Sequence, residues 1–159
     1  LLAEDNRTNR LIARKLLERS VATLAEAANG RSAVDMYRAK PPDLVLMDVS
    51  MPEMDGLEAT RAIRAHEAAS GLRHCTIHAL TAYSSADQEA ACLEAGLDGV
   101  LTKPLARAEL YALLTRIAAE RDHFDLSPGL ALDEEEEGGS PWSISPQGST
   151  TTIGKSTRS

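Results

Sequence analysis

Cysteine, aromatic residues and long apolar runs are all scarce in this chain of 159 residues. Its two cysteines, Cys75 and Cys92, follow no metal-binding or redox spacing, so we expect buried or half-buried thiols of a cytoplasmic protein and no disulfide. No apolar run approaches the roughly 20 residues of a membrane-spanning helix, and no signal-peptide pattern is present. We therefore expect no membrane contact by this segment.

Positive charge is in short supply as well. The net charge is −7, yet residues 1–121 hold 17 acidic and 15 basic side chains, whereas residues 122–159 hold 7 acidic and 2 basic side chains. The longer part is nearly neutral and lacks the basic surface typical of nucleic-acid binding, so we expect no nucleic-acid partner. The chain starts with Leu1 inside an apolar run, and we expect it to be a fragment whose true N-terminus is missing.

Residues 122–159 have no apolar periodicity. They contain an acidic run at 133–137 followed by glycine, serine, proline and threonine, a composition that cannot bury enough apolar surface to fold. We predict a folded domain over 1–121 and an acidic, disordered tail over 122–159. Gly154, Lys155 and Ser156 in this tail look like part of a P-loop, but their spacing from Gly148 is one residue too long.

Short apolar runs alternate with helical patterns throughout residues 1–121. The strand-like runs are 1–4, 21–27, 44–47, 76–80 and 100–101, and the helical segments are 8–19, 31–39, 56–69, 85–95 and 106–121. Gly96 stands where a helix C-cap belongs, and Asp55 suits the N-terminus of the third helix. Strict alternation of strands and helices predicts an α/β fold, a parallel sheet covered by helices on both faces.

Polar side chains follow four of these strands. They are Glu4 and Asp5 after the first strand, Asp48 after the third, Thr81 after the fourth, and Thr102, Lys103 and Pro104 after the fifth. Ligands of open α/β sheets bind beyond the carboxyl ends of the strands. We therefore expect three carboxylates, one hydroxyl and one ammonium group to meet in a shallow pocket.

The expected pocket has the composition of a phosphoryl-transfer site. Clustered carboxylates repel one another unless a cation or proton intervenes, and an oxygen-rich site with open positions suits Mg²⁺. Asp48 is the candidate nucleophile, which would form an aspartyl phosphate. Mg²⁺ and Lys103 would neutralise the phosphoryl oxygens, and Thr81 would donate a hydrogen bond to one of them.

Four segments, taken together, resemble the receiver domains of response regulators and hybrid sensor kinases. The segments are 1–6 (LLAEDN), 48–56 (DVSMPEMDG), 79–82 (ALTA) and 101–105 (LTKPL), and the resemblance covers residues 1–121 in family order and spacing. It implies a flavodoxin-like, doubly wound fold. The five parallel strands of that fold lie in the order 2-1-3-4-5, and five helices flank them.

The resemblance also implies a metal-binding role for the acidic residues. Asp5 would be a direct Mg²⁺ ligand, and Glu4 would act largely through water. Asp48 would be both phosphoacceptor and metal ligand. The backbone carbonyl of Ser50 would be the third protein ligand.

A second set of residues would contact the phosphoryl group. The resemblance implies that Thr81 is the switch hydroxyl, that Ala82 leaves the phosphate room, and that Lys103 binds the phosphate. It also implies a cis Lys103–Pro104 bond. Receivers often carry an aromatic residue three positions before the lysine, and this chain has Val100 there, so its output face is expected to signal differently or less.

The predicted function is phosphorelay signalling. The chain would take a phosphoryl group from the phosphohistidine of a histidine kinase or histidine phosphotransfer protein and then change conformation. It would be a switch with self-phosphorylation and autodephosphorylation chemistry, and not an enzyme in its own right. Glu-Asp-Asn followed by Asn9, together with the motif at 51–56, is most similar to the C-terminal receivers of hybrid kinases. The face of the fourth helix, fifth strand and fifth helix is a candidate for self-association.

Other functions stay open at this point. The chain could be a stand-alone response regulator, or an interaction module that kept the fold and lost phosphorylation. A third alternative is a hydrolase of the haloacid dehalogenase kind, but those enzymes place a second aspartate where this chain has Ser50. The acidic residues and Lys103 could also be an ordinary surface ion network, and Thr81 could simply cap the segment that follows it.

Overall fold

Strands and helices alternate along residues 1–120, the part of the chain that the computed structural model describes. The strands are β1 (Leu2–Ala3), β2 (Glu26–Ala27), β3 (Leu44–Asp48), β4 (Thr76–Thr81) and β5 (Gly99–Thr102). The helices are α1 (Arg7–Leu17), α2 (Gly30–Ala39), α3 (Gly56–Ser70), α4 (Ala86–Ala95) and α5 (Arg107–Glu120). The predicted tail at 122–159 lies outside the described residues, as does Arg121, and the domain boundary there stays a prediction.

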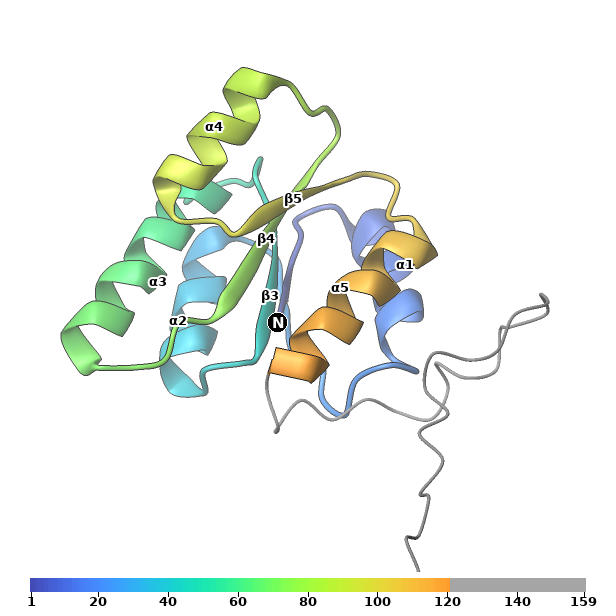
Figure 1. Ribbon diagram of the computed structural model, residues 1–159. Helices are drawn as coiled ribbons and strands as arrows, with labels where there is room; N and C mark the ends of the chain where they lie inside the picture. Colours follow the sequence, from blue (N-terminus) through green and yellow to red (C-terminus); the bar gives the residue numbers. More distant parts are fainter. Residues whose placement is uncertain (121–159) are drawn as a thin grey trace, which may run out of the picture.

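The five strands form one parallel sheet in the order β2-β1-β3-β4-β5. Helices α2, α3 and α4 cover one face of this sheet, and α1 and α5 cover the other (Figure 1). The predicted doubly wound α/β fold and its strand order are therefore confirmed. All strands run the same way, so their carboxyl ends, and the loops that follow them, share one edge of the sheet.

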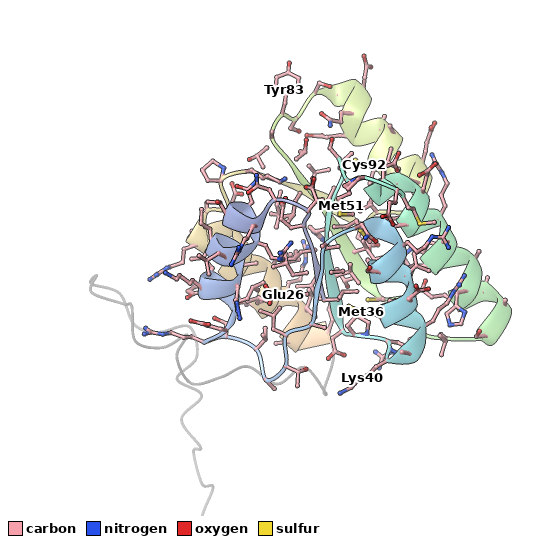
Figure 2. All side chains as sticks on the ribbon, turned by 180° about the vertical axis from the view of Figure 1, so that it is seen from behind. Glu26, Met36, Lys40, Met51, Tyr83 and Cys92 are labelled. Atoms are coloured by element: carbon pink, nitrogen blue, oxygen red, sulfur yellow. The ribbon has the colours of Figure 1, made fainter. Side chains whose placement is uncertain are left out.

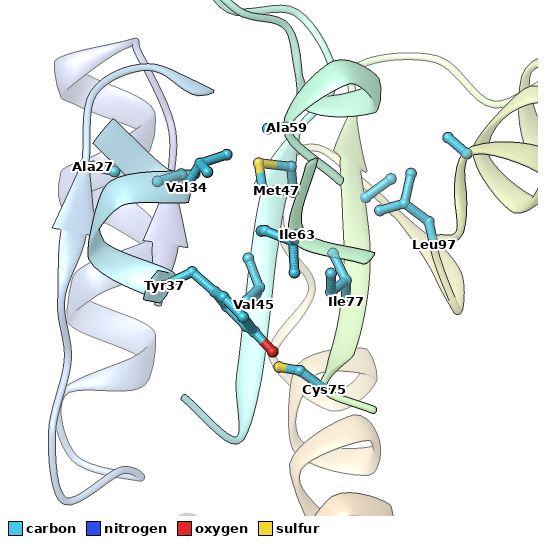
Figure 3. Packing of buried hydrophobic residues seen from close by; sticks show 14 of the residues in the cluster. Ala27, Val34, Tyr37, Val45, Met47, Ala59, Ile63, Cys75, Ile77 and Leu97 are labelled. Carbon is cyan, nitrogen blue, oxygen red and sulfur yellow. The ribbon is translucent and has the colours of Figure 1, made fainter. Parts of the chain in front are cut away.

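The two faces of the sheet carry separate apolar clusters. Val45 and Met47 of β3 point into the cluster under α2, α3 and α4, which also holds Tyr37 and Ile63 (Figure 3). The alternate residue Leu46 points into the cluster under α1 and α5. Because successive side chains of a strand face opposite sides, a central strand buried on both faces must be apolar throughout. This explains why residues 44–47 form an unbroken apolar run.

Helix termini carry the capping residues expected from the sequence. The Asp55 side chain accepts a hydrogen bond from the Glu58 amide at 2.8 Å, and the Glu58 side chain accepts one from the Asp55 amide at 3.1 Å. This reciprocal pair is a capping box, which starts α3 at Gly56. Gly96 ends α4 with φ +103°, in the left-handed region that favours glycine.

A polar network centred on Arg64 joins α3, β4 and α4 near the amino ends of the strands. The Arg64 guanidinium donates to the Gly96 carbonyl at 2.9 Å, to the Cys75 carbonyl at 2.8 Å, to Glu67 at 2.8 Å and to Asp98 at 3.0 Å. Asp98 also accepts from the Ile77 amide at 2.8 Å. These bonds fix the far end of the sheet, opposite the loops that follow the strands.

The second strand is shorter than the sequence predicted. The second strand was expected over 21–27 but pairs only at Glu26 and Ala27, because its partner β1 offers two residues in register with it. Cys75 and Cys92 are both buried and form no disulfide, as predicted. Among the described helices, none has the length and apolarity that a bilayer crossing requires.

Candidate functional site

Three acidic side chains meet at the carboxyl ends of β1 and β3. Glu4 and Asp48 are buried, with 1% and 3% of their surface exposed, whereas Asp5 is exposed. One carboxylate oxygen from each residue lies within 4.8 Å of the others. The predicted acidic cluster is therefore assembled in space from segments that are more than forty residues apart in sequence.

Lys103 lies between the two buried carboxylates. Its Nζ atom is 2.8 Å from Glu4 Oε2 and 3.1 Å from Asp48 Oδ1. Burial raises the pKa of Asp48 to about 7; the neighbouring Glu4 adds to this rise, and Lys103 opposes it. For Lys103, burial alone would lower the pKa, but its hydrogen bonds to Glu4 and Asp48 prevail and raise it. The ammonium group therefore stays charged and neutralises part of the acidic cluster.

The loop from β1 to α1 holds the acidic pair in place through Asn6 and Arg10, for which the sequence predicted no contact with Glu4. Arg10 donates from Nη1 to the Glu4 carbonyl oxygen at 2.8 Å. The backbone N–H of Asn6 donates to Glu4 Oε1 at 3.0 Å. The Asn6 side-chain oxygen caps α1 by accepting from the backbone N–H groups of Thr8 and Asn9. Asn before a helical pattern is a recognised N-cap signal. The Arg10 side chain reaches back to the carbonyl of Glu4, and no sequence pattern predicts that contact.

Asp48 is oriented by the chain that follows it. The Ser50 amide donates to Asp48 Oδ1 at 3.2 Å, and the intervening Val49 amide donates to the Leu80 carbonyl of β4 at 3.1 Å. Ser50 and Ala82 both line the pocket that contains the acidic cluster. The Lys103–Pro104 peptide bond is cis, as expected.

Thr81 lies at the end of β4 in the wall of the same pocket, with 5% of its surface exposed. Its hydroxyl donates to the Tyr83 carbonyl at 2.7 Å and accepts from Gln88 Nε2 at 3.1 Å. The Tyr83 side chain itself points out from the body of the molecule, and 71% of its surface is exposed (Figure 2). The structure thus brings Thr81 to the site but engages its hydroxyl proton elsewhere.

Gln88 was not among the predicted site residues. It stands three positions after Ser85, the N-cap of α4, and a glutamine at that position usually reaches back to the N-cap amide. Here its side chain reaches Thr81 instead. The sequence alone predicted no role for Gln88, and only the fold shows that it borders the pocket.

The donor set fits a small divalent cation. Carboxylate oxygens are the ligands that Mg²⁺ and Ca²⁺ prefer, and three of them lie close together here. One ammonium group cannot balance three carboxylates, so the cluster retains negative charge for a cation to neutralise.

Val100, three positions before Lys103, is half-buried on β5 and packs against the apolar cluster under α2, α3 and α4.

Known proteins resemble this chain in both sequence and fold. The family described as response regulator receiver domain matches residues 1–115. Sensor protein GacS of Pseudomonas syringae pv. syringae is 42% identical over 116 residues, a match that covers 73% of this chain and 13% of GacS. The chain therefore spans about an eighth of the length of that curated relative.

Two solved structures add information about their own proteins. The receiver domain of sensor histidine kinase PA1611 from Pseudomonas aeruginosa, solved with a magnesium ion coordinated in its active site cleft, is 36% identical with a TM-score of 0.64, covering 74% of this chain and 94% of that one. The receiver domain of Ssk1 from Saccharomyces cerevisiae, solved with the histidine phosphotransfer protein Ypd1, is 31% identical with a TM-score of 0.65, covering 74% and 83%.

Proposed function

Since this chain belongs to the response regulator receiver domain family, we propose that Asp48 accepts a phosphoryl group from a phosphohistidine side chain. The observation that carries this proposal is the placement of Asp48 3.1 Å from Lys103, beside the acidic pair Glu4 and Asp5. A nucleophilic carboxylate, a neutralising cation and a metal-binding acidic pair are what phosphoryl transfer requires.

The transfer is a displacement at phosphorus. An oxygen of the Asp48 carboxylate forms a bond to phosphorus while the bond from phosphorus to the imidazole nitrogen breaks, and the electron pair of that bond stays on the imidazole. Lys103 already contacts Asp48, so its ammonium group is placed to neutralise a phosphoryl oxygen. Thr81 would rotate its hydroxyl to donate to another of these oxygens.

We propose that Mg²⁺ is the cation of this site. Asp5, Asp48 and the backbone carbonyl of Ser50 would hold it, and Glu4 would act through water. When bound, the ion supplies charge neutralisation for the phosphoryl oxygens. The magnesium ion in the PA1611 receiver supports this assignment.

The donor would be a histidine kinase or a histidine phosphotransfer protein, and the Ssk1–Ypd1 complex supports a partner of this kind. A donor protein must dock around the pocket. Leu11 and Ile12 of α1 are exposed by 46% and 45%, and Ile12 shares a hollow beside Lys103 with Pro104 and Leu105. We propose that this apolar patch, made of Leu11, Ile12 and Leu105, receives the phosphohistidine protein.

We propose that this receiver belongs to a hybrid sensor kinase and works in the cytoplasm; the identity to the sensor protein GacS, of which the match covers 13%, supports a receiver within a longer sensor protein. On this proposal the domain is a phosphoacceptor switch within a larger signalling protein. Self-association through α4, β5 and α5 stays a prediction.

Phosphoryl incorporation tests the proposal directly. The whole chain is incubated with acetyl phosphate and Mg²⁺, and its intact mass is compared with those of Asp48→Asn, Lys103→Ala and, as a matched control, Asp35→Asn on the exposed side of α2. We expect one acid-stable, base-labile phosphoryl group on the parent and on Asp35→Asn, much slower uptake by Lys103→Ala, and none by Asp48→Asn. Uptake by Asp48→Asn would overturn the assignment of Asp48. An inert parent that also fails to bind Mg²⁺ would favour the interaction module.

A further inference from the structure

The hydroxyl of Thr81 is fully committed in this conformation. It donates to the Tyr83 carbonyl at 2.7 Å and accepts from Gln88 Nε2 at 3.1 Å and from the Tyr83 amide at 3.3 Å. A hydroxyl has a single proton to donate. Thr81 therefore cannot donate to a phosphoryl group on Asp48 without giving up its bond to Tyr83.

Gln88 ties this hydroxyl to α4. It lies in the first turn of the helix, where its backbone N–H donates to the Ser85 hydroxyl oxygen at 3.2 Å. Its side chain lines the pocket that holds Asp48 and Lys103. Within the described residues, Gln88 is the member of α4 that borders this pocket.

The first turn of α4 has few other anchors. The buried residues of this helix are Cys92 and Ala95, both in its second half. Ser84 hydrogen-bonds to Glu89, but that contact is exposed and stays within the loop and the helix it precedes. Segments with few buried apolar contacts open at low free-energy cost. The hydrogen bond from Gln88 to Thr81 therefore contributes a large share of what holds this turn in position.

We propose that Gln88 is a positioning residue that couples the Thr81 hydroxyl to the first turn of α4, so that phosphorylation of Asp48 releases this turn. The inference rests on the proposed function. Rotation of Thr81 toward a phosphoryl oxygen carries Oγ1 away from Gln88 Nε2 and from the Tyr83 carbonyl. Both groups then lose their partner, and the loop at 82–85 and the start of α4 rearrange together.

The coupling has two measurable consequences. Without the Gln88 bond, rotation of Thr81 toward the phosphoryl group breaks one hydrogen bond fewer. A phosphoryl analogue should therefore bind more tightly. A neutral hydrogen bond contributes about 0.5–1.5 kcal/mol, which corresponds to a roughly two- to ten-fold change in affinity. The start of α4 should also stop responding to the analogue, because the bond that reports the movement of Thr81 is gone.

Backbone amide NMR of the whole chain measures both effects, with beryllium fluoride and Mg²⁺ as the probe. The variants are Gln88→Leu, which keeps the size of the side chain but removes its donor, and Gln88→Ala as a second variant. Glu94→Leu, an exposed change on the same helix, is the matched control. In the parent and in Glu94→Leu we expect shifts at 48–50, at 81–83 and at 86–89.

In both Gln88 variants we expect the shifts at 48–50 and 81–83 to persist, those at 86–89 to fall by at least half, and the probe to bind two- to ten-fold more tightly. Shifts of parental size at 86–89 in Gln88→Leu and Gln88→Ala would overturn the coupling while leaving the proposed function intact. A parent whose amides at 48–50 do not respond to the probe would overturn the proposed function, and the coupling with it.

Discussion

Gly56 packs so closely against Asp48 that a Cβ at Gly56 would lie 2.1 Å from the Asp48 carbonyl oxygen. The Gly56 amide also donates to the Val49 carbonyl at 3.0 Å. The first residue of α3 is thus seated directly on the end of the strand that carries the proposed phosphoacceptor. Only glycine permits this approach, so the position of α3 and the direction of the loop after Asp48 depend on each other.

Replacing Gly56 by alanine should therefore destabilise the fold. The methyl group would meet backbone atoms, which cannot rotate aside, and we expect the free energy of unfolding to fall by about 3 kcal/mol. Urea unfolding followed by circular dichroism measures this. Gly71→Ala is the control, because a Cβ there meets nothing within 4 Å and the cost comes only from φ +63°, about 1 kcal/mol. Equal losses in the two variants would contradict the close approach at Gly56.

Lys103→Met should make stability depend on Mg²⁺. The change leaves the buried carboxylates of Glu4 and Asp48 without their ammonium partner, and we expect a loss of about 3 kcal/mol in EDTA. Saturating Mg²⁺ should restore most of it, because a ligand that binds only the folded state stabilises it. The measurement is urea unfolding in EDTA and in Mg²⁺, with the exposed Lys40→Met as control. A variant that stays equally unstable in Mg²⁺ would show that the metal does not bind beside these carboxylates.

Glu67 should make the fold sensitive to acid. Burial alone would raise its pKa, but hydrogen bonds from the Cys75 amide, Tyr37 and Arg64 prevail and lower it below the ordinary 4.5. A carboxylate with a lowered pKa contributes stability above pH 4.5, and this contribution is lost as the pH falls through its value in the folded protein. We expect Glu67→Gln to cost about 2 kcal/mol at neutral pH and the gap to the parent to narrow below about pH 4.

Urea unfolding of the parent and Glu67→Gln across this pH range gives the comparison. Glu94→Gln, on an exposed part of α4, should differ little from the parent at any pH. A gap between Glu67→Gln and the parent that keeps its neutral-pH size in acid would mean that the folded protein does not lower the pKa of Glu67.

Ile12→Asp should separate docking from chemistry. An aspartate on the proposed apolar patch would be buried against the donor protein, and we expect phosphotransfer from a phosphorylated histidine phosphotransfer protein such as Ypd1 to slow roughly ten-fold or more. Uptake from acetyl phosphate should stay at the parental rate, since a small donor needs no docking surface. Leu72→Asp, a comparably exposed leucine just after α3, should transfer normally. Equal slowing with both donors would place the fault of Ile12→Asp in the fold or the site.

Features encoded by neighbouring residues were predictable from the sequence. The run at 44–47 is apolar because β3 is buried on both faces, and the charged residue that ends it marks the edge where ligands bind. Asp55 marks the start of α3 because an N-cap side chain bonds to an amide three positions later, here that of Glu58. The convergence of Glu4, Asp48 and Lys103 then follows from strand order.

Features that depend on distant partners were not predictable. Arg64 and Glu67 lie three positions apart in a helix, and nothing near them in the sequence points to their partners. Those partners, Cys75 and Asp98, lie outside α3. The length of β2 depends on the residues that β1 offers in register, and no local pattern contains that information. Gln88 fits a capping pattern just as well as it fits its contact with Thr81, and the choice between the two is made by the packing of α4 on the sheet.

The bond from Arg64 to the carbonyl of Gly96 has a mechanical consequence for α4. It pins the last turn of α4 to α3 at 2.9 Å, whereas the first turn is tethered to the sheet through Gln88. If the Gln88 bond breaks while the Arg64 bond stays, α4 would rotate about its C-terminal end at Gly96. It would not move along its own axis. The largest displacement would then fall at the tip beside Tyr83, with almost none at Gly96.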